Sequence, residues 1–425
     1  MERFVIEGGR QLSGTITPVG NKNAALPLLA ATLLTDRPVV LHNIPTIGDV
    51  ATKIALLQKL GVAVSRRDEH SWALHAAAID ATEPDTTLAR KIRTSMLLAG
   101  PLLARRGSVT LPRPGGDQIG RRRLDTHFLA LRELGASVEV TPTAYEMRAD
   151  RLRGADLFLD EMSVTGTEQA VLAAVVAEGT TVISNAASEP HVQDLCHCLN
   201  AMGARISGIG TNCLVIDGVN GLSGTEFTIG PDYMEVVSFI GLAAVTKSEL
   251  HIKDARPHEH RMTKIAFSKL GVTWHDHGND IAVPAAQELM MQSDAHDAIP
   301  QIASAPWPGF NTDLLITALV VATQAQGTVL IHEKMFENRL FFVDRLISMG
   351  ARIILCDPHR AVVAGPSQLY GEHLSSPDIR AGMALVIAAL CAQGQSVIDN
   401  IGQIDRGYER IEQRLRALGA HIDRV

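Results

Sequence analysis

The sequence predicts an α/β fold of six repeats of roughly 70 residues, with buried helices inside and sheets outside. The first observation is a glycine that ends a helical segment and precedes an alternating strand. Along the 425-residue chain this glycine recurs at Gly61, Gly135, Gly203, Gly271, Gly350 and Gly419. The second is a helix that is apolar almost all round, which recurs at 23–34, 94–104, 167–178, 234–246, 312–323 and 379–392. Helices without a polar face must be buried on all sides, and outer sheets would cover them.

The elements of each repeat follow from local residue preferences. After the apolar helix comes a short turn and a strand, as in PVVLHNI at 38–44. An amphipathic helix then ends at the glycine, which readily takes the left-handed backbone of a C-terminal cap. Alternating residues follow, as in ASVEV after Gly135. Six such units divide into two domains of three. A solenoid is the alternative, but solenoid repeats are usually shorter, roughly 20–50 residues.

Polar residues precede each apolar helix and can cap it. Asn23 and Thr312 are suitable N-caps, and Thr165 with Glu168 has the spacing of a capping box. Carboxylates at a helix start also suit the helix dipole. The candidates for this role are Asp232, Asp313 and Asp378.

Three cations stand at the same helix starts and are not explained by capping. They are Lys22, Arg93 and Arg380. A cation is unfavourable at the positive end of a helix. The mismatch disappears if an anion binds between the helix end and the cation. The helix starts, in two groups of three, therefore predict two domains that face one anion-binding cleft.

The composition is that of an ordinary soluble globular protein and excludes several partners. Apolar residues are 46% and charged residues 20% of the chain, and the net charge is -7. We expect no nucleic-acid partner, because an acidic chain repels phosphate. We expect no membrane partner, because the longest apolar runs, such as 383–392, are too short to span a bilayer. The N-terminus has no secretory signal, so a cytoplasmic location is expected.

The cysteines and histidines do not predict a metal site. Five cysteines fit a reducing compartment. Cys196 and Cys198 flank His197, but residues two apart on a helix do not share a face. No set of ligands with zinc-type spacing appears, so we expect no metal.

The segment LPRPGGDQIGRRR at 111–123 places one acid, Asp117, among Pro and Gly and ahead of three arginines. A solvated surface loop is the plain interpretation of such a stretch. Glycine also permits hinges and close backbone approach, which a mobile lid requires.

Several motifs together make the whole chain resemble one enzyme family. They are GNKNAALP at 20–27, IRTS at 92–95, PGGDQIG at 114–120 with Arg122, FENR at 336–339, DIR at 378–380 and IDRGYERIE at 404–412. The chain resembles the UDP-N-acetylglucosamine enolpyruvyl transferases (1-carboxyvinyltransferases) of the EPSP synthase-like superfamily. The resemblance implies two inside-out α/β barrels. One domain would be 22–230, carrying the lid 111–123, and the other 1–21 plus 231–425, with the active site between them.

The family transfers the enolpyruvyl group of phosphoenolpyruvate to the 3-hydroxyl of UDP-N-acetylglucosamine and releases phosphate, the first committed step of peptidoglycan synthesis. The resemblance implies no cofactor. It implies catalytic roles for Asp117, Asp313 and Lys22. Phosphoenolpyruvate contacts are implied for Lys22, Asn23, Arg122, Arg339, Arg380 and Arg406. UDP-sugar contacts are implied for Asn23, Arg93, Arg122, Arg123, Leu124, Asp125, Thr126, Ser163, Val164, Thr165, Asp313 and Met335. Supporting roles are implied for Asp378, Glu337 and Asn338.

The lid residue of the family is most often a cysteine, and here it is Asp117. In the family this residue protonates the methylene carbon and assists product release. A carboxyl group can do so only while it holds a proton, which desolvation favours and neighbouring guanidinium groups oppose. Fosfomycin inhibits the family by alkylating the lid cysteine, so we expect insensitivity.

Other functions remain open at the level of sequence. SVTGTE at 163–168, PDYMEVVS at 231–238 and NTDLL at 311–315 depart from the family's usual residues near the acceptor. A paralogue that acts on another nucleotide hydroxyl is therefore an alternative. A non-catalytic UDP-sugar sensor is a second, although a sensor has little use for the carboxylate of Asp313. A shikimate-3-phosphate enolpyruvyl transferase fits less well, because GNKNAALP and IDRGYERIE indicate the nucleotide-sugar branch.

Overall fold

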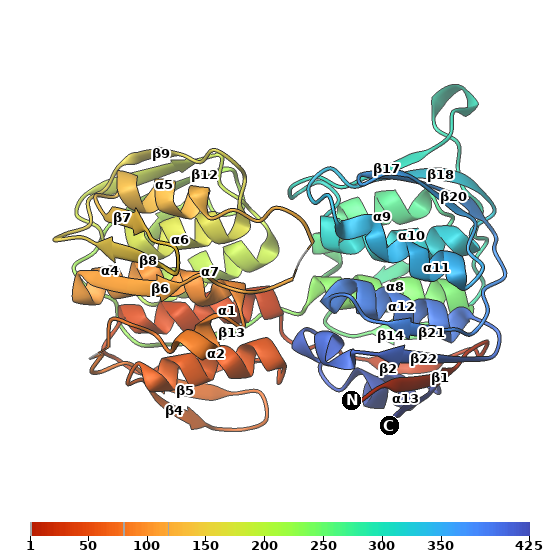
Figure 1. Cartoon of the computed structure of the whole chain (residues 1–425), viewed down its shortest axis with the longest axis horizontal. Coiled ribbons are helices and arrows are strands. Elements are labelled where there is room, and N and C mark those ends of the chain that lie inside the picture. Colours follow the sequence, from red (N-terminus) through yellow and green to blue (C-terminus); the bar gives the residue numbers. More distant parts are fainter. Residues whose placement is uncertain (1, 80, 118) are drawn as a thin grey trace. The chain divides into compact units, whose positions relative to one another are not determined.

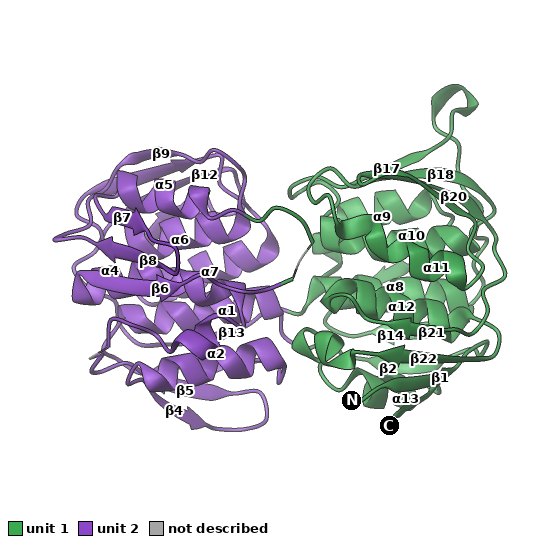
Figure 2. Ribbon diagram, in the orientation of Figure 1, with its two compact units in different colours: residues 1–19, 117–122, 231–425 green, residues 20–116, 123–230 purple. Residues whose placement is uncertain are grey.

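The computed structural model describes residues 2–79, 81–117 and 119–425, which form two compact units (Figure 2). Unit 1 contains residues 1–19, 117–122 and 231–425, and unit 2 contains 20–116 and 123–230. The segment 117–122 departs from the expected division, in which the domain 22–230 carries the whole lid. It groups with unit 1 because its backbone and side chains contact Glu337, Asn338 and Arg406 of that unit.

Unit 2 has three interior helical segments, as the apolar repeats predicted (Figure 1). They are α1 (Lys22–Ala31) with η1 (Thr32–Leu34), η2 (Arg93–Leu98) with α4 (Ala99–Arg106), and α6 (Val164–Ala174). The other helices of the unit are α2 (Gly48–Lys59), α3 (Thr86–Ala89), α5 (Asp125–Glu133) and α7 (Pro190–Ala201). Residues of the interior helices belong to one continuous apolar core.

Three sheets cover the core of unit 2. The first has the order β13-β3-β5-β4, the second β6-β8-β7 and the third β11-β12-β10-β9. Their strands are β3 (Val39–His42), β4 (Ala63–Arg66), β5 (Trp72–His75), β6 (Ser108–Pro112), β7 (Ser137–Val140), β8 (Ala144–Arg148), β9 (Asp156–Phe158), β10 (Thr180–Ser184), β11 (Arg205–Ser207), β12 (Cys213–Asp217) and β13 (Thr225–Thr228).

Unit 1 repeats this plan around three interior helices that contact one another. They are α8 (Tyr233–Thr246), α10 (Thr312–Gln324) and α12 (Ile379–Cys391). All residues of α8 are buried, which is why its sequence has no polar face. The remaining helical segments are η3 (Pro257–His260), α9 (Arg261–Ser268), η4 (Ala295–Asp297), η5 (Arg339–Phe342), α11 (Val343–Ser348), η6 (Ile401–Arg406) and α13 (Ile411–Ala417).

Three four-stranded sheets cover the core of unit 1. Their orders are β21-β22-β1-β23, β15-β16-β14-β2 and β17-β18-β20-β19. The strands are β1 (Phe4–Glu7), β2 (Ser13–Ile16), β14 (Glu249–Ile252), β15 (His275–His277), β16 (Asp280–Val283), β17 (Gln301–Ala303), β18 (Gly327–His332), β19 (Ile353–Asp357), β20 (Arg360–Gly365), β21 (His373–Ser375), β22 (Gln395–Asp399) and β23 (His421–Arg424). Strand β1 lies antiparallel between β22 and β23, so both ends of the chain belong to one sheet.

The glycine repeat is confirmed at all six positions. Each glycine has a positive φ, from 79° at Gly271 to 104° at Gly350, and follows an outer helix. This backbone region suits glycine because a side chain would crowd the carbonyl group. The α/β fold with buried helices and outer sheets is therefore confirmed.

The predicted N-caps are partly wrong. Asp232 and Asp378 do cap α8 and α12. The cap of α1 is Asn21 rather than Asn23, and the cap of α10 is Asn311 rather than Thr312. In each case an asparagine slightly earlier in the chain reaches the free N–H groups first.

The predicted capping box at Thr165 is also wrong. Ser163 caps α6 and accepts a hydrogen bond from the Gly166 backbone N–H at 3.2 Å. Glu168 lies buried inside the helix instead of returning to a cap.

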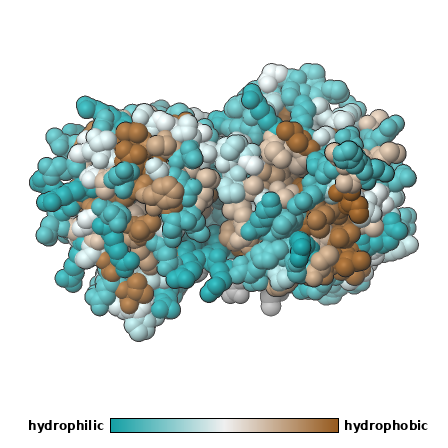
Figure 3. Space-filling view, turned by 90° about the horizontal axis from the view of Figure 1, so that it is seen from above, coloured by the Kyte–Doolittle hydropathy of each residue, from teal (hydrophilic) through white to brown (hydrophobic). Residues whose placement is uncertain are grey.

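Within the described residues, no helix is long and apolar enough to cross a membrane. On the face shown in Figure 3, hydrophilic residues cover most of the surface and apolar residues form separate patches. Exposed apolar side chains such as Phe158 and Ile354 belong to outer strands.

Candidate active site

Two buried arginines in unit 1 flank one carboxylate at the start of α10. Arg339 is 3% exposed and forms an ion pair with Asp313. The Arg380 Nε lies 3.6 Å from the other oxygen of Asp313. Burying a guanidinium group is costly unless a carboxylate or another anion accompanies it. Asp313 therefore partly compensates both arginines, which come from different parts of the chain.

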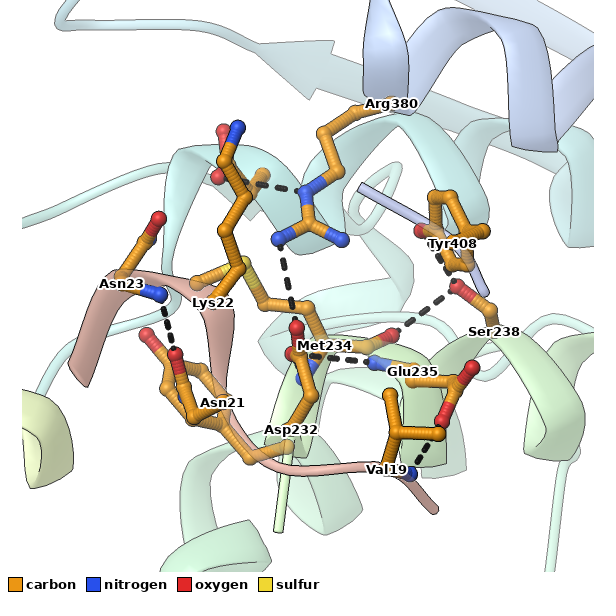
Figure 4. Close-up of polar contacts among 12 residues, drawn as sticks. Val19, Asn21, Lys22, Asn23, Asp232, Met234, Glu235, Ser238, Arg380 and Tyr408 are labelled. Carbon is orange, nitrogen blue, oxygen red and sulfur yellow. Dashed lines mark hydrogen bonds and ion pairs between the residues drawn. The ribbon is translucent and has the colours of Figure 1, made fainter. Parts of the chain in front are cut away.

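Arg380, in the first turn of α12, has further partners at the start of α8 and between η6 and α13 (Figure 4). Its Nη2 lies 3.7 Å from Asp232 Oδ2, and its guanidinium lies over the Tyr408 ring, 5.2 Å from the ring centre. Tyr408 is held by a hydrogen bond of 3.2 Å to the Ser238 hydroxyl. Burial opposes the charge of Arg380, but Tyr408, Asp232 and Asp313 raise the pKa of its guanidinium well above the ordinary value.

Both arginines retain buried donors that could bind a ligand. Arg339 Nε and Arg380 Nη1 have no hydrogen-bond acceptor among the described residues. A buried donor without an acceptor destabilises the folded state. Such a group in a native protein can be explained by a ligand or ion that accepts its hydrogen bond. Guanidinium donors suit phosphate and carboxylate groups, because two N–H bonds can be made in parallel.

Asp378 and Arg122 lie at the edge of this cluster. Asp378 caps α12 and lies 3.7 Å from Arg339. Burial raises the pKa of Asp378, and Arg339 partly opposes this rise. Burial lowers the pKa of Arg122, with a partly compensating effect of Asp117 and a further lowering by Arg339. Unit 1 thus brings together Arg122, Arg339 and Arg380 of the predicted phosphoenolpyruvate residues.

The lid acid forms an ion pair within unit 1. Asp117 Oδ1 lies 2.6 Å from Arg406 Nη1, which also donates to Gln403 at 2.7 Å. Arg406 is one of the predicted phosphoenolpyruvate residues. In this structure its guanidinium is therefore bound by the carboxylate of the chain itself.

The backbone of the lid contacts the predicted supporting residues. The Asn338 N–H donates to the Ile119 carbonyl at 3.0 Å, and the Arg121 N–H donates to Glu337 at 3.1 Å. Gly120 has a φ of 143°, and a Cβ there would lie 2.5 Å from a Glu337 carboxylate oxygen. Glycine is therefore required for this close approach.

In unit 2, Lys22 begins α1 with its ammonium group mostly buried. Its Nζ lies 2.8 Å from an Asp49 carboxylate oxygen. Asn21, the residue before it, accepts hydrogen bonds from the Asn23 and Ala24 N–H groups (Figure 4). The ion pair with Asp49 of α2 explains how a cation is accommodated at a helix start, where the dipole is unfavourable.

A polar pocket in unit 2 contains several predicted UDP-sugar residues. It is lined by Arg123, Asp125, Thr126, Asp160 and Glu161. Arg123 forms a two-point ion pair with Asp125, at 2.7 and 2.8 Å. The Thr126 hydroxyl donates to Asp160 at 2.7 Å.

The predicted residues around that pocket lie at the starts of two helices. Arg93 donates to the Arg123 carbonyl at 2.8 Å, and Leu124 is the residue before α5. Ser163 caps α6, and Val164 and Thr165 form its first turn. The Thr165 hydroxyl is 2.9 Å from His127 of α5. The free N–H groups of helix starts suit the binding of phosphate groups.

Met335 belongs to unit 1 and lies on the loop before η5. Its side chain is 36% exposed, and its backbone N–H donates to Glu333 at 2.7 Å.

Sequence reasoning missed several residues that hold the site together. Asp49, Asp160 and Glu161 had no proposed role, although each now contacts or lines a predicted site. Tyr408 lies inside the IDRGYERIE motif, and its position in that motif was a usable signal. Asp49 gave no local signal, because its partner Lys22 belongs to another helix.

Comparisons with known proteins agree with this chemistry. The family model for EPSP synthase (3-phosphoshikimate 1-carboxyvinyltransferase) matches residues 6–415. A UDP-N-acetylglucosamine 1-carboxyvinyltransferase of Treponema denticola is 55% identical over 100% of this chain and 99% of its own. The enzyme of the same name from Bradyrhizobium diazoefficiens is 54% identical over 100% of this chain and 98% of its own.

Solved structures are similar in fold. The enolpyruvyl transferase NikO from Streptomyces tendae superposes with a TM-score of 0.88 at 23% identity, over 100% of this chain and 99% of its own. An EPSP synthase from Acinetobacter baumannii superposes with a TM-score of 0.76 at 17% identity, over the full length of both chains.

Proposed function

The chain belongs to the EPSP synthase family, and we propose that within it the chain acts as a UDP-N-acetylglucosamine 1-carboxyvinyltransferase. It is an enzyme of peptidoglycan synthesis. It transfers the enolpyruvyl group of phosphoenolpyruvate to the 3-hydroxyl of UDP-N-acetylglucosamine and releases phosphate. Relatives more than 50% identical across the full length support this assignment.

One observation of the structure carries the proposal. Arg339 and Arg380 are buried on either side of Asp313, and each keeps a buried N–H group without an acceptor among the described residues. The arginines would bind the anionic groups of phosphoenolpyruvate. Asp313, the carboxylate between them, is our proposed acceptor of the hydroxyl proton.

We assign the remaining steps as follows. Asp313 takes the proton of the sugar hydroxyl, whose oxygen attacks the central carbon of phosphoenolpyruvate. Asp117 gives a proton to the methylene carbon, which becomes a methyl group in the tetrahedral intermediate. Asp117 then takes back a methyl proton as the bond from carbon to the phosphate oxygen breaks, which restores the double bond, and Asp313 returns its proton to the departing phosphate. Lys22 and Arg406 would stabilise the charge on the phosphate as its bond to carbon breaks.

The lid ion pair gives Asp117 two proposed roles. While Asp117 forms the ion pair with Arg406, its carboxylate blocks the guanidinium group that we propose binds the substrate. Substrate anions would displace it from Arg406, and the freed carboxylate would take up a proton from solvent before it acts as the acid. Because position 117 offers no thiol for alkylation, we propose that fosfomycin does not inactivate the enzyme.

The polar pocket between the starts of α5 and α6 is our proposed site for the nucleotide part of the acceptor. Its residues include Arg123, Asp125 and Thr126. We propose the cytoplasm as the location, because the five free cysteines fit a reducing compartment.

The direct test is phosphate release from phosphoenolpyruvate with and without UDP-N-acetylglucosamine. We expect release only in the presence of the acceptor. Turnover with other nucleotides but not with this one would favour the paralogue. Binding of the UDP-sugar without any phosphate release would favour the sensor.

An Arg380→Lys variant tests whether the buried guanidinium of Arg380 binds phosphoenolpyruvate. Lysine keeps the charge but loses the planar pair of donors, so the KM for phosphoenolpyruvate should rise about tenfold or more. Arg424→Lys is the matched control, because Arg424 pairs with Asp405 and Glu412 instead. An unchanged KM in Arg380→Lys would contradict the assignment.

A further inference from the structure

A fully buried carboxylate, Glu333, follows strand β18 in unit 1. It accepts four hydrogen bonds from described residues. Its Oε1 accepts from the Ser304 hydroxyl at 2.9 Å and from the backbone N–H groups of Met335 at 2.7 Å and Phe336 at 3.1 Å. Its Oε2 accepts from the Thr312 hydroxyl at 2.5 Å. These donors compensate for the loss of water around the buried group.

The donors belong to two segments that carry proposed active-site residues. Thr312 is the first residue of α10 and directly precedes Asp313. Met335 and Phe336 lie on the loop that leads to Arg339, whose N–H donates to the Phe336 carbonyl at 3.2 Å. One carboxylate therefore fixes the distance between the start of α10 and this loop.

The backbone of Glu333 is hydrogen-bonded as well as its side chain. Its N–H donates to the His359 carbonyl at 2.7 Å, and its carbonyl lies 2.7 Å from His359 Nδ1. The Ser304 hydroxyl, which donates to Glu333, also accepts from the Lys334 N–H at 2.8 Å. A network in which every member is bonded holds its geometry closely.

We propose that Glu333 is a positioning residue, which holds Asp313 and Arg339 in register for proton transfer and substrate binding. The proposal rests on the proposed function of those two residues. Glu333 itself contacts neither the proposed base nor the proposed arginines. It acts through Thr312 on one side and through the Met335–Phe336 backbone on the other. Displacing a reacting group by about 1 Å can slow a reaction about a hundredfold.

Two substitutions test the proposal with little change of volume. Glu333→Gln offers one acceptor oxygen in place of two, so at least one of the present donors must face an amide NH2 group. Thr312→Val removes the hydroxyl and keeps the shape of the side chain. In both variants we expect kcat to fall about tenfold or more and the KM for phosphoenolpyruvate to rise.

The KM separates positioning from folding. A variant that is merely less stable contains less active enzyme, so its kcat falls while its KM is unchanged. Because Thr312→Val removes one of the four hydrogen bonds that Glu333→Gln alters, the double variant should lose less activity than the product of the two single losses. The control is Glu412→Gln, a buried acid of α13 that bonds to Arg424 instead, and its kinetics should equal those of the parent.

Three results would overturn the proposal. One is a KM for phosphoenolpyruvate within twofold of the parent in both single variants. Another is a double variant whose loss equals the product of the two single losses. An inactive parent would overturn the proposed function, and the role of Glu333 with it, whereas an active parent with unaffected variants would overturn only the latter.

Discussion

At the scale of single residues, carboxylates for which we propose catalytic roles form ion pairs with the arginines of unit 1. Asp313 accompanies both Arg339 and Arg380, and Asp117 accompanies Arg406. An arriving substrate with its own phosphate and carboxylate can replace these internal anions. Under the proposed function, substrate binding would exchange one set of ion pairs for another, so less charge would be newly buried.

His260 gives a prediction about pH and stability in unit 1. The residue is 1% exposed, its Nε2 lies 2.9 Å from the Ala255 carbonyl, and its Nδ1 has no partner among the described residues. Burial lowers the pKa of His260 from 6.5 to about 4. Between these values the unfolded chain binds a proton that the folded chain does not, so the free energy of unfolding falls as pH decreases. The loss should amount to about 3 kcal/mol.

Urea unfolding between pH 7 and pH 4 checks this prediction. In His260→Gln, which can still donate to the Ala255 carbonyl, the pH-dependent loss should be smaller by about 3 kcal/mol. His277→Gln, at an exposed strand position, should keep the full dependence. Identical pH profiles for the parent and His260→Gln would show that His260 does not titrate as stated.

The sequence supported a prediction of chemistry for single residues but not of their ion-pair partners. The types and motif positions of Lys22, Arg339 and Arg380 indicated anion binding. Their partners Asp49 and Asp232 were not identified, because ion pairs between helices leave no periodic signal. Asn21 and Asn311 are the caps because each has an extended backbone immediately before the first helical residue, and the sequence pattern did not fix that boundary.

At the scale of elements, the lid segment requires its backbone at Gly120 to lie close to Glu337. Gly120→Ala would place a Cβ 2.5 Å from the Glu337 carboxylate and 3.1 Å from the Glu337 nitrogen, at a φ of 143° that alanine rarely adopts. The lid should then fail to settle against residues 336–339. We expect kcat to fall about tenfold to a hundredfold, with thermal stability unchanged, because the segment adds little to the core.

Steady-state kinetics and thermal unfolding of the same preparations measure both quantities. Gly221→Ala is the matched control, since a Cβ there meets nothing within 4 Å. If Gly120→Ala retained at least half of the parent kcat, the contact between the lid and Glu337 would not be needed for turnover.

Helix and strand identities were largely predictable, because apolar periodicity and glycine caps are local signals. All six apolar helices and all six glycines are found where the repeats placed them. The association of residues 117–122 with unit 1 had no local signal. It depends on contacts such as Arg121 with Glu337, which are 216 residues apart in sequence.

At the scale of the whole molecule, two units each bury their own apolar core. Leu319 of α10 belongs to the core of unit 1, and Leu172 of α6 belongs to that of unit 2. Sequence repeats predicted this division because each group of three repeats supplies three interior helices. The repeats alone did not group the N-terminus with 231–425, and that expectation came from the family resemblance; strand β1 lies between β22 and β23.

Separate cores predict separate responses to substitution. Leu319→Ala should cost about 2–5 kcal/mol, because a fully buried leucine leaves a cavity. Hydrogen exchange should rise in the slowest amides of unit 1 and remain unchanged in those of unit 2. Leu172→Ala should give the reverse pattern. An equal loss of protection in both units would show that the chain unfolds as one cooperative body.

The central claim is that the chain transfers an enolpyruvyl group with Asp117 as the acid. The most direct measurement is phosphate release from phosphoenolpyruvate and UDP-N-acetylglucosamine by the parent, Asp117→Asn and Asp117→Cys, each with and without fosfomycin. We predict turnover in the parent, a loss of about a hundredfold or more in Asp117→Asn, and retained turnover in Asp117→Cys that fosfomycin alone abolishes. Full activity in Asp117→Asn, or covalent inactivation of the parent by fosfomycin, would contradict the account.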